Sequence, residues 1–272
     1  MDGPFADVAL AVRLESFAAI ELQRFVDAAR RVFPECHAGV LEVAGGVAAF
    51  CLPGAPFNQA TGLGLHGPVG PEEIDQLEAF FGERGEPVRV NVCPFAHESL
   101  PGELSCRGYR VAEFENVLVR ALDPEEVLPA PDPLVAIRVV KQSERAVWSR
   151  AVARGFSATG LLTDAEEQVA RMMAAQEGTI ELLALLDEEP VATAELAVGD
   201  GLGWLSADTT LPAYRGRGLQ TALQRRRLRL AQEAGCDLAV TESRPGSASQ
   251  RNMERLGFKI VYTRVDMVQT EG

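Results

Sequence analysis

The stretch that decides the fold runs Thr209-Thr-Leu-Pro-Ala-Tyr-Arg-Gly-Arg-Gly-Leu-Gln-Thr221, where an apolar segment passes into a long helical pattern through a cationic turn. Glycine lets a backbone come close to a ligand, and the first N–H groups of a helix, together with its dipole, favour a negative charge. Arg215 and Arg217 can add charge-assisted hydrogen bonds. The segment predicts a site for an anion such as a pyrophosphate; the alternative is a surface turn with solvated arginines.

The segments around this turn predict a mixed α/β domain. A capping-box pair, Thr163 and Glu166, opens one helix, and turn signals at Asp187–Pro190 and Gly199–Gly203 separate three meandering strands. The fold class is therefore α/β, of the α+β type, with a mixed, mostly antiparallel sheet flanked by helices. The expected strands are Leu134–Val140, Ile180–Leu186, Val191–Val198, Trp204–Leu211, Leu238–Thr241 and Phe258–Val268, and the expected helices include Ala146–Phe156, Leu219–Ala234 and Ser247–Leu256.

The first half of the chain repeats the second in outline. Val88–Val92 matches Leu238–Glu242, and each is followed by a proline, a short segment and an edge-like strand, at an offset of about 150 residues. The helix Pro71–Phe81 takes the place of the long helix after the cationic turn. Between the halves, Asp123–Pro133 carries four prolines and four acids, which is typical of a linker. We predict two copies of one fold, at 1–122 and 134–272; a coincidence between unrelated domains is the alternative.

The cationic turn and the end of the chain resemble the GNAT acetyltransferase superfamily. Arg215–Gln220 resembles its Arg/Gln-x-x-Gly-x-Gly/Ala signature, and Leu256-Gly257-Phe258 resembles its Leu-Gly-Phe before the last strand. The resemblance implies an acetyl-coenzyme A site in a V-shaped opening between two splayed parallel strands, with backbone N–H near Thr210 polarising the thioester carbonyl. The cofactor contacts assigned on this basis are Thr209, Thr210, Leu211, Arg215, Gly216, Arg217, Gly218, Leu219, Gln220, Thr221, Ser249 and Asn252.

Two positions depart from the family pattern. Gln220 stands where a small residue normally permits close approach of phosphate, which predicts a rearranged phosphate contact. Met253 stands where the family often has a tyrosine that protonates the departing thiolate, and methionine has no proton to donate. The substitutes that we consider are Tyr214, Tyr262, or a water held by Ser247, Ser249 or Asn252.

A base must also be found, because an alkylammonium of pKa about 10.4 is mostly charged at pH 7. Asp208 and Glu195 are the candidates, and strand alternation places Asp208 on one face with Trp204, Ser206 and Thr210. For either carboxylate, a plain solvated or hydrogen-bonded role is the alternative.

Three other signals carry less weight. Gly62–Gly67 has the glycine spacing of a dinucleotide-binding loop, but prolines follow at once and remove N–H donors where a helix should begin. We interpret the segment as an eroded counterpart of the cationic turn. The first domain would then form a wall of the acceptor pocket. Weak cofactor binding there is the alternative. Most of the cluster Arg225, Arg226, Arg227 and Arg229 is expected on the solvated face of its helix. The three histidines stand far apart, and no metal is expected.

The composition indicates the cellular compartment and the classes of partner that are disfavoured. A formal charge of -13 disfavours nucleic acid and anionic membrane surfaces as partners. Five scattered cysteines, no apolar leader and no membrane span predict a reduced, cytoplasmic chain. Whether the chain forms a homodimer is left open.

These features predict an enzyme that moves acetyl from acetyl-CoA to a primary amine of a small molecule or peptide, by direct transfer in a ternary complex. The alternative is a non-catalytic acyl-CoA-binding or protein-interaction module. A peptidyl-tRNA or amino-acid ligase of the same fold is disfavoured by the acidic charge.

Overall fold

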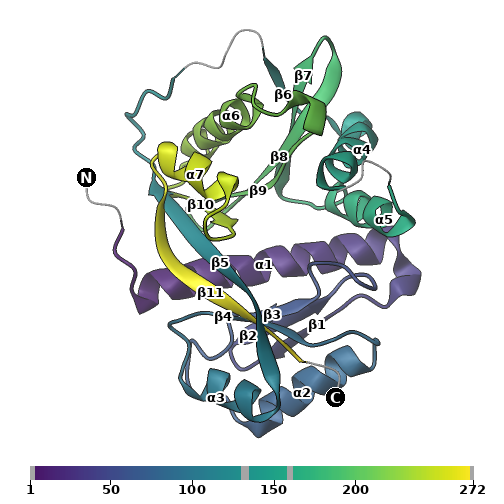
Figure 1. Cartoon of the computed structure of the whole chain (residues 1–272), viewed down its shortest axis with the longest axis vertical. Helices are drawn as coiled ribbons and strands as arrows, with labels where there is room; N and C mark the ends of the chain where they lie inside the picture. Colours follow the sequence, from purple (N-terminus) through teal and green to yellow (C-terminus); the bar gives the residue numbers. More distant parts are fainter. Residues whose placement is uncertain (1–3, 130–134, 158–161, 270–272) are drawn as a thin grey trace. The chain divides into compact units, whose positions relative to one another are not determined.

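The computed structural model describes residues 4–129, 135–157 and 162–269 (Figure 1). The chain divides into two compact units, the first made of Met1–Leu118 with Ser243–Gly272 and the second of Val119–Glu242. The two units therefore do not follow the predicted domains, since residues 243–272 group with the first half by contact. The prediction rests on a repeat rather than on contacts, and it stays a prediction.

The first unit is a sheet covered by helices, with strand order β1-β2-β3-β4-β11-β5. The final strand, β11, lies antiparallel to β4, with Val265 opposite Val92. Strands β3 and β4 are parallel and pair at Ala60 and Val90. The elements are α1 (Val8–Val32), β1 (Gly39–Val43), β2 (Gly46–Phe50), β3 (Gln59–Thr61), α2 (Pro71–Gly82), β4 (Arg89–Val92), α3 (Ser99–Cys106), β5 (Tyr109–Ala121), α7 (Ala248–Arg255) and β11 (Lys259–Gln269).

Local sequence explains where the helices of the first unit begin and what they bury. The Asp7 carboxylate accepts the Leu10 N–H at 2.8 Å and so caps α1. In α2, Ile74, Leu77 and Phe81 recur at helical spacing, and all three are fully buried in the core of this unit. The apolar stripe therefore fixes the face that α2 turns toward the sheet.

The second unit has the strand order β10-β9-β8-β7-β6. Strands β6 to β9 form an antiparallel meander, and β10 is parallel to β9. Helices α4 and α6 lie on opposite sides of these strands (Figure 1). The elements are β6 (Ala136–Val139), α4 (Arg145–Phe156), α5 (Asp164–Met173), β7 (Thr179–Leu186), β8 (Glu189–Gly199), β9 (Leu202–Thr210), a 3-10 turn (Pro212–Tyr214), α6 (Leu219–Glu233) and β10 (Leu238–Ser243).

The predicted fold class is confirmed, because the sheet is mixed, mostly antiparallel and flanked by helices. The order α2-β4-α3-β5 is repeated as α6-β10-α7-β11. The predicted capping box of Thr163 and Glu166 is also present at the start of α5. Leu134, at the start of the first predicted strand of the second half, lies outside the described residues, and that strand is described from Ala136.

The described part of the predicted linker, residues 123–129, packs on α6. The Arg229 guanidinium donates to the carbonyls of Leu128 and Pro129, at 2.7 and 2.9 Å, and Gln232 donates to the Asp123 carbonyl at 2.7 Å. The remainder of the predicted linker lies outside the described residues. The carbonyls of the described residues Asp123, Leu128 and Pro129, which lie in no helix or sheet, thus take their hydrogen bonds from a neighbouring helix.

Some classes of feature are missing from the described part of the chain. None of its helices is long and apolar enough to cross a membrane. No group of three potential metal-ligating side chains gathers there. The five cysteines are all free thiols, and three of them are buried.

Candidate functional site

The cationic turn lies between β9 and α6 and ends in a helix start whose N–H groups are open. Gly216 and Gly218 adopt left-handed φ angles of +74° and +75°, a region that residues with a side chain rarely enter. Gly218 is the N-cap of α6, and it has no side chain to accept the N–H groups behind it. Within the described residues, the N–H groups of the first helical turn, 219–221, donate to no protein acceptor. Open N–H groups at a helix start are a ready site for an anion.

The charge of this turn is not compensated by neighbouring acids. Arg215 and Arg217 are exposed. The Arg215 Nε donates to the Thr210 carbonyl at 3.2 Å, and the Arg217 guanidinium stands 5.3 Å from the centre of the Tyr214 ring. Among the described carboxylates, none forms an ion pair with either arginine. Both positive charges therefore remain available to a phosphate group.

The parallel strands β9 and β10 separate next to this turn. Their pairing runs from Leu202 with Leu238 to Leu205 with Thr241 and stops there, while β9 continues to Thr210 paired with β8. The Leu211 N–H donates to the Val191 carbonyl on the β8 side at 3.0 Å. Because successive N–H groups of a strand point to opposite edges, the Thr210 N–H points to the open edge. This is the geometry that a peptide-like or thioester ligand needs in order to extend the sheet.

A β-bulge in β9 changes which face each side chain occupies. Glu195 pairs with Ser206 and Thr193 with Thr209, so two residues of β9 stand opposite one residue of β8. Ala207, at φ +54°, takes up the extra residue. A bulge of one residue reverses the alternation beyond it. The prediction that Asp208 shares a face with Trp204 and Ser206 is therefore wrong.

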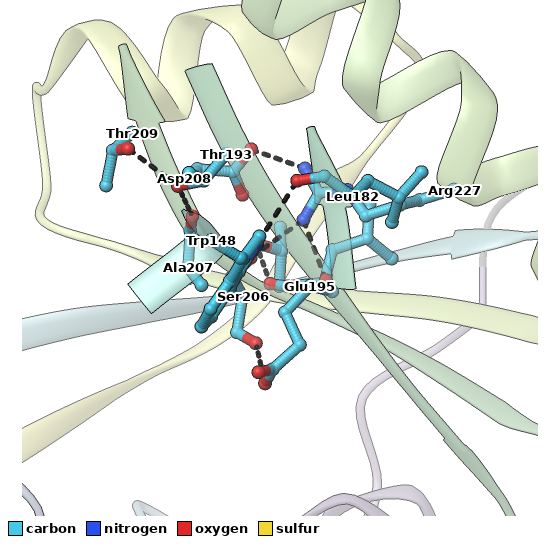
Figure 2. Close-up of polar contacts among 11 residues, drawn as sticks. Trp148, Leu182, Thr193, Glu195, Ser206, Ala207, Asp208, Thr209 and Arg227 are labelled. Carbon is cyan, nitrogen blue, oxygen red and sulfur yellow. Dashed lines mark hydrogen bonds and ion pairs between the residues drawn. The ribbon is translucent and has the colours of Figure 1, made fainter. Parts of the chain in front are cut away.

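Asp208 instead faces α6, where it meets Arg227 (Figure 2). Arg227 is fully buried, and its guanidinium bonds the Asp208 carboxylate and donates to the carbonyls of Glu195 and Ser206, each at 3.0 Å. The prediction of a solvated arginine cluster is wrong for Arg227, while Arg225, Arg226 and Arg229 are half-buried. Because Arg227 bonds two strands beside the bulge, it fixes the irregular part of β9.

The two candidate bases have different surroundings. Burial raises the pKa of Asp208, while Arg227 and the Gln220 amide lower it in part. Glu195 is buried on the other face of the sheet, where its carboxylate accepts the Ser206 hydroxyl at 3.1 Å (Figure 2). The bulge therefore separates the two carboxylates, so that they do not act on one proton together.

Helix α4 covers the face that carries Glu195. A Cβ added to Gly155 would stand 2.2 Å from the Thr209 hydroxyl oxygen, so α4 passes against β9 at this point. The Thr209 and Thr193 hydroxyls are 2.6 Å apart, and Thr193 donates to the Ala207 carbonyl at 3.0 Å. On this face, the Trp148 indole N–H donates to the Leu182 carbonyl at 3.2 Å. The two hydroxyl groups thus hold the bulge from the side opposite Arg227, while the indole attaches α4 to β7.

The remaining predicted site residues belong to the first unit. Tyr262 donates its hydroxyl proton to Glu15 at 2.7 Å, and burial raises the pKa of this tyrosine well above its usual range. The Arg264 Nε donates to the same carboxylate at 2.8 Å. Ser249 and Asn252 are half-buried on α7, and Met253 beside them is buried. Their predicted roles toward the cofactor stay predictions.

The first unit contains a counterpart of the cationic turn, before α2, that lacks the features of an anion site. Its counterpart helix, α2, begins with Pro71, which has no N–H. The Glu73 carboxylate accepts the Gly70 N–H at 2.9 Å, and the Ser99 hydroxyl accepts the Val69 N–H at 2.7 Å. A helix start that already holds its own carboxylate repels a second anion. This supports the interpretation of the first loop as an eroded site.

Sequence reasoning missed Arg227 as a residue of the site, although a signal was present. Leu223, Arg227 and Ala231 recur at helical spacing on the apolar stripe of α6. A charged residue inside such a stripe indicates a buried ion pair. By contrast, nothing in the period of β9 marks the bulge, because Ala207 is not a residue type that favours a left-handed φ.

Comparison with known proteins agrees with this geometry. Residues 150–258 match the model of the acetyltransferase (GNAT) family. A GCN5-related N-acetyltransferase from Kribbella flavida superposes with a TM-score of 0.65 at 18% identity, over 94% of this chain and 96% of that one. A tandem GNAT protein from the clavulanic acid biosynthesis pathway, solved without AcCoA, superposes with a TM-score of 0.62 at 15% identity, over 98% of this chain and 96% of that one. No curated protein matches the sequence.

These similarities between structures concern the fold, and the match to the family model concerns the segment that contains the cationic turn, the bulge and α6. We conclude that the chain has the fold of the tandem GNAT proteins and that residues 150–258, in its C-terminal half, are similar to the acetyltransferase (GNAT) family.

Proposed function

We propose that the protein transfers an acetyl group from acetyl-CoA to a primary amine of a small molecule or peptide. The observation that carries the proposal is the open start of α6, where unpaired N–H groups, two left-handed glycines and two uncompensated arginines meet beside the free edge of β9. A diphosphate fits this chemistry, because the helix dipole, the N–H groups and the guanidinium groups all favour negative charge.

The residues present fit the co-substrate on two further counts. Residues 215–221 would hold the pyrophosphate, and Thr209–Leu211 on the open edge of β9 would hold the pantetheine arm. The Thr210 N–H, which points to that edge, would stabilise the negative charge that develops on the thioester oxygen. Gln220 faces Asp208, so its side chain turns away from a phosphate on the open N–H groups.

The chemistry is a direct transfer. The amine nitrogen attacks the thioester carbonyl carbon, a C–N bond forms, the C–S bond breaks, and the thiolate takes up a proton. The attacking nitrogen gives up a proton to a base or through water. Asp208, with its raised pKa, lies on the α6 face of the bulge, and Glu195 lies on the α4 face. The face from which the amine enters decides between them, so Asp208→Asn and Glu195→Gln should differ sharply in their effect on kcat.

The proton for the thiolate has few candidate donors. Tyr262 donates to Glu15 and Tyr109 to Glu78, while Met253 has no proton to give. Tyr214, in the cationic turn itself, is the third tyrosine of the chain. A thiolate also leaves without help, because its parent thiol has a pKa of about 8.5.

The test measures release of free CoA thiol from acetyl-CoA in the presence of a broad panel of primary amines. Thiol release that depends on both substrates is expected, and Arg215→Glu should weaken binding of CoA by at least about tenfold, since it reverses a charge at the pyrophosphate. Arg226→Glu is the matched control, because Arg226 lies on α6, beyond the cationic turn, and pairs with Glu233. Unchanged CoA affinity in Arg215→Glu would contradict the proposed site.

A non-catalytic acyl-CoA-binding module is the second candidate. It is favoured by two observations about the candidate proton donors: Met253 is buried and has no proton to give, and the Tyr262 hydroxyl already donates to Glu15. Tight CoA binding without turnover of any amine would support it. For either function, the charge of -13 argues against a nucleic-acid or membrane partner, and we expect a cytoplasmic protein.

A further inference from the structure

Gln224 of α6 is buried without a partner. Its exposed fraction is 0%, and neither its amide nitrogen nor its amide oxygen has a hydrogen-bond partner among the described residues. A buried amide that has given up water and gained no hydrogen bond destabilises the fold. Such a group is expected to have a partner that the chain itself does not supply.

The position of Gln224 along α6 follows from its neighbours. Gln220, four residues before it, and Arg227, three residues after it, both act on Asp208 of β9. Residues three and four apart share a helix face. Farther along, α6 passes over the paired part of β9, where a Cβ on Gly203 would stand 2.7 Å from the Ala231 Cβ. Gln224 therefore lies over the part of β9 beyond Leu205, where pairing with β10 has ended.

The other flank of α6 shows which way Gln224 faces. Leu219, Ala222 and Leu223 pack with residues of β7 and β8 in one apolar cluster. In the strand order, β9 and then β10 follow β8 on the side away from β7. The flank that carries Gln224 thus faces the opening between β9 and β10, next to the bulge.

We infer that Gln224 determines which acyl group the protein accepts, and that it selects an acyl group bearing a hydroxyl over an apolar acyl group of the same size. The inference rests on the proposed function, because the acyl end of the co-substrate must reach this opening. A hydroxyl both donates and accepts, so it satisfies the carbonyl oxygen and the amide nitrogen of one glutamine together. The transfer itself is unchanged, with a C–N bond formed and the C–S bond broken.

Discrimination of this kind is strong because a ligand without the hydroxyl suffers two losses at once. A pocket that pairs a hydroxyl with a buried amide loses the hydrogen bond when the ligand lacks the hydroxyl, and the amide is left unpaired again. Hydroxyacetyl-CoA and propionyl-CoA are equal in non-hydrogen atoms and differ in one hydroxyl against one methyl. They therefore isolate the contribution of the hydrogen bond from that of size.

The experiment measures the dissociation constants of the full chain for CoA, acetyl-CoA, hydroxyacetyl-CoA and propionyl-CoA by titration calorimetry. We expect hydroxyacetyl-CoA to bind at least about tenfold more tightly than propionyl-CoA. In Gln224→Leu this ratio should fall to about one or invert, while the affinity for CoA stays within about threefold. Gln224→Met, of similar length, repeats the test if the leucine variant is misfolded.

Gln176→Leu is the matched control. Gln176 is also fully buried with both amide atoms unpaired, but it lies between α5 and β7. Both glutamine variants should melt no lower than the native chain, and Gln176→Leu should leave the selectivity ratio intact.

Three outcomes would overturn the inference. A native ratio of about one means that a bound water satisfies Gln224, and a ratio that survives in Gln224→Leu means that another residue sets it. A parallel loss of affinity for all four ligands in Gln224→Leu means that the side chain contacts the pantetheine arm instead. Absence of heat with every ligand in the native chain would overturn the proposed cofactor site as well. That result differs from the other three, in which the native chain still binds CoA.

Discussion

Replacing Arg227 by methionine tests whether the buried ion pair holds the bulge of β9. The guanidinium is fully buried, and it bonds the Asp208 carboxylate and the carbonyls of Glu195 and Ser206. Methionine keeps the length of the aliphatic stem and removes all of these hydrogen bonds. It also leaves the Asp208 carboxylate buried without a positive neighbour.

The expected loss of stability follows from these lost hydrogen bonds and from the unpaired carboxylate. Removing one partner of a buried pair costs about 3–5 kcal/mol of the free energy of unfolding. For a chain of this size, each kcal/mol lowers Tm by about 2–4 °C, so Arg227→Met should melt roughly 10 °C lower. Arg226→Met is the control, because its guanidinium pairs with Glu233 at the surface at 3.7 Å, where an ion pair contributes about 0–1 kcal/mol.

A double-mutant cycle separates the pair from its surroundings. Asp208→Asn alone leaves Arg227 buried with two carbonyl partners, and it should also destabilise the protein. Arg227→Met with Asp208→Asn should cost less than the sum of the single losses by about 1–3 kcal/mol, since neither charge is then left alone. Denaturant unfolding followed by circular dichroism measures each value. If the losses add to within about 0.5 kcal/mol, the two side chains are not coupled and the reasoning fails.

Further changes test the turn, the helix contact and the buried carboxyls. Arg215→Glu should weaken CoA binding at least about tenfold, with the loss shrinking as salt rises, as calorimetry at two ionic strengths would show. Gly155→Ala should destabilise the protein by about 1–3 kcal/mol, because the new methyl group would stand 2.2 Å from the Thr209 hydroxyl oxygen and 2.3 Å from its Cβ, and the loss in thermal unfolding should be smaller in a Thr209→Gly background, which lacks both atoms. Burial raises the pKa of Glu21 to about 7, so the folded chain holds this proton more tightly than the unfolded chain and stability should fall as pH rises from about 4.5 to about 7. Glu21→Gln should flatten that slope in denaturant titrations across this range. Tyr214→Phe should lower kcat with little change in KM if its hydroxyl protonates the thiolate.

Much of the secondary structure could be predicted from short-range patterns. The apolar stripe of α2, the capping box of α5 and the helix after Gly218 depend on residues within a few turns of one another, and all are present in the structure. The predicted strands of the second half also occur, with ends that differ by a few residues. Local propensity and periodicity are sufficient there, because tertiary packing agrees with them.

The candidate site could be predicted only in part. The cationic turn could be predicted because glycine, arginine and a following helix are adjacent in sequence, and each of them favours an anion through its own backbone or charge. The face of Asp208 was not readable, since the reversal depends on a bulge against β8. The burial of Arg227 was likewise hidden, because a run of arginines is usually solvated unless a buried carboxylate receives one of them.

The sequence by itself determined the order of helices and strands in the second half and the glycine- and arginine-containing start of the long helix at 215–221, because these depend on residues close together along the chain. The tertiary structure decided which face each carboxylate occupies, where the final strand pairs and which buried amide remains without a partner. The physical reason is that a strand alternates only while its pairing is regular, and the satisfaction of a buried polar group depends on neighbours that sequence distance does not reveal.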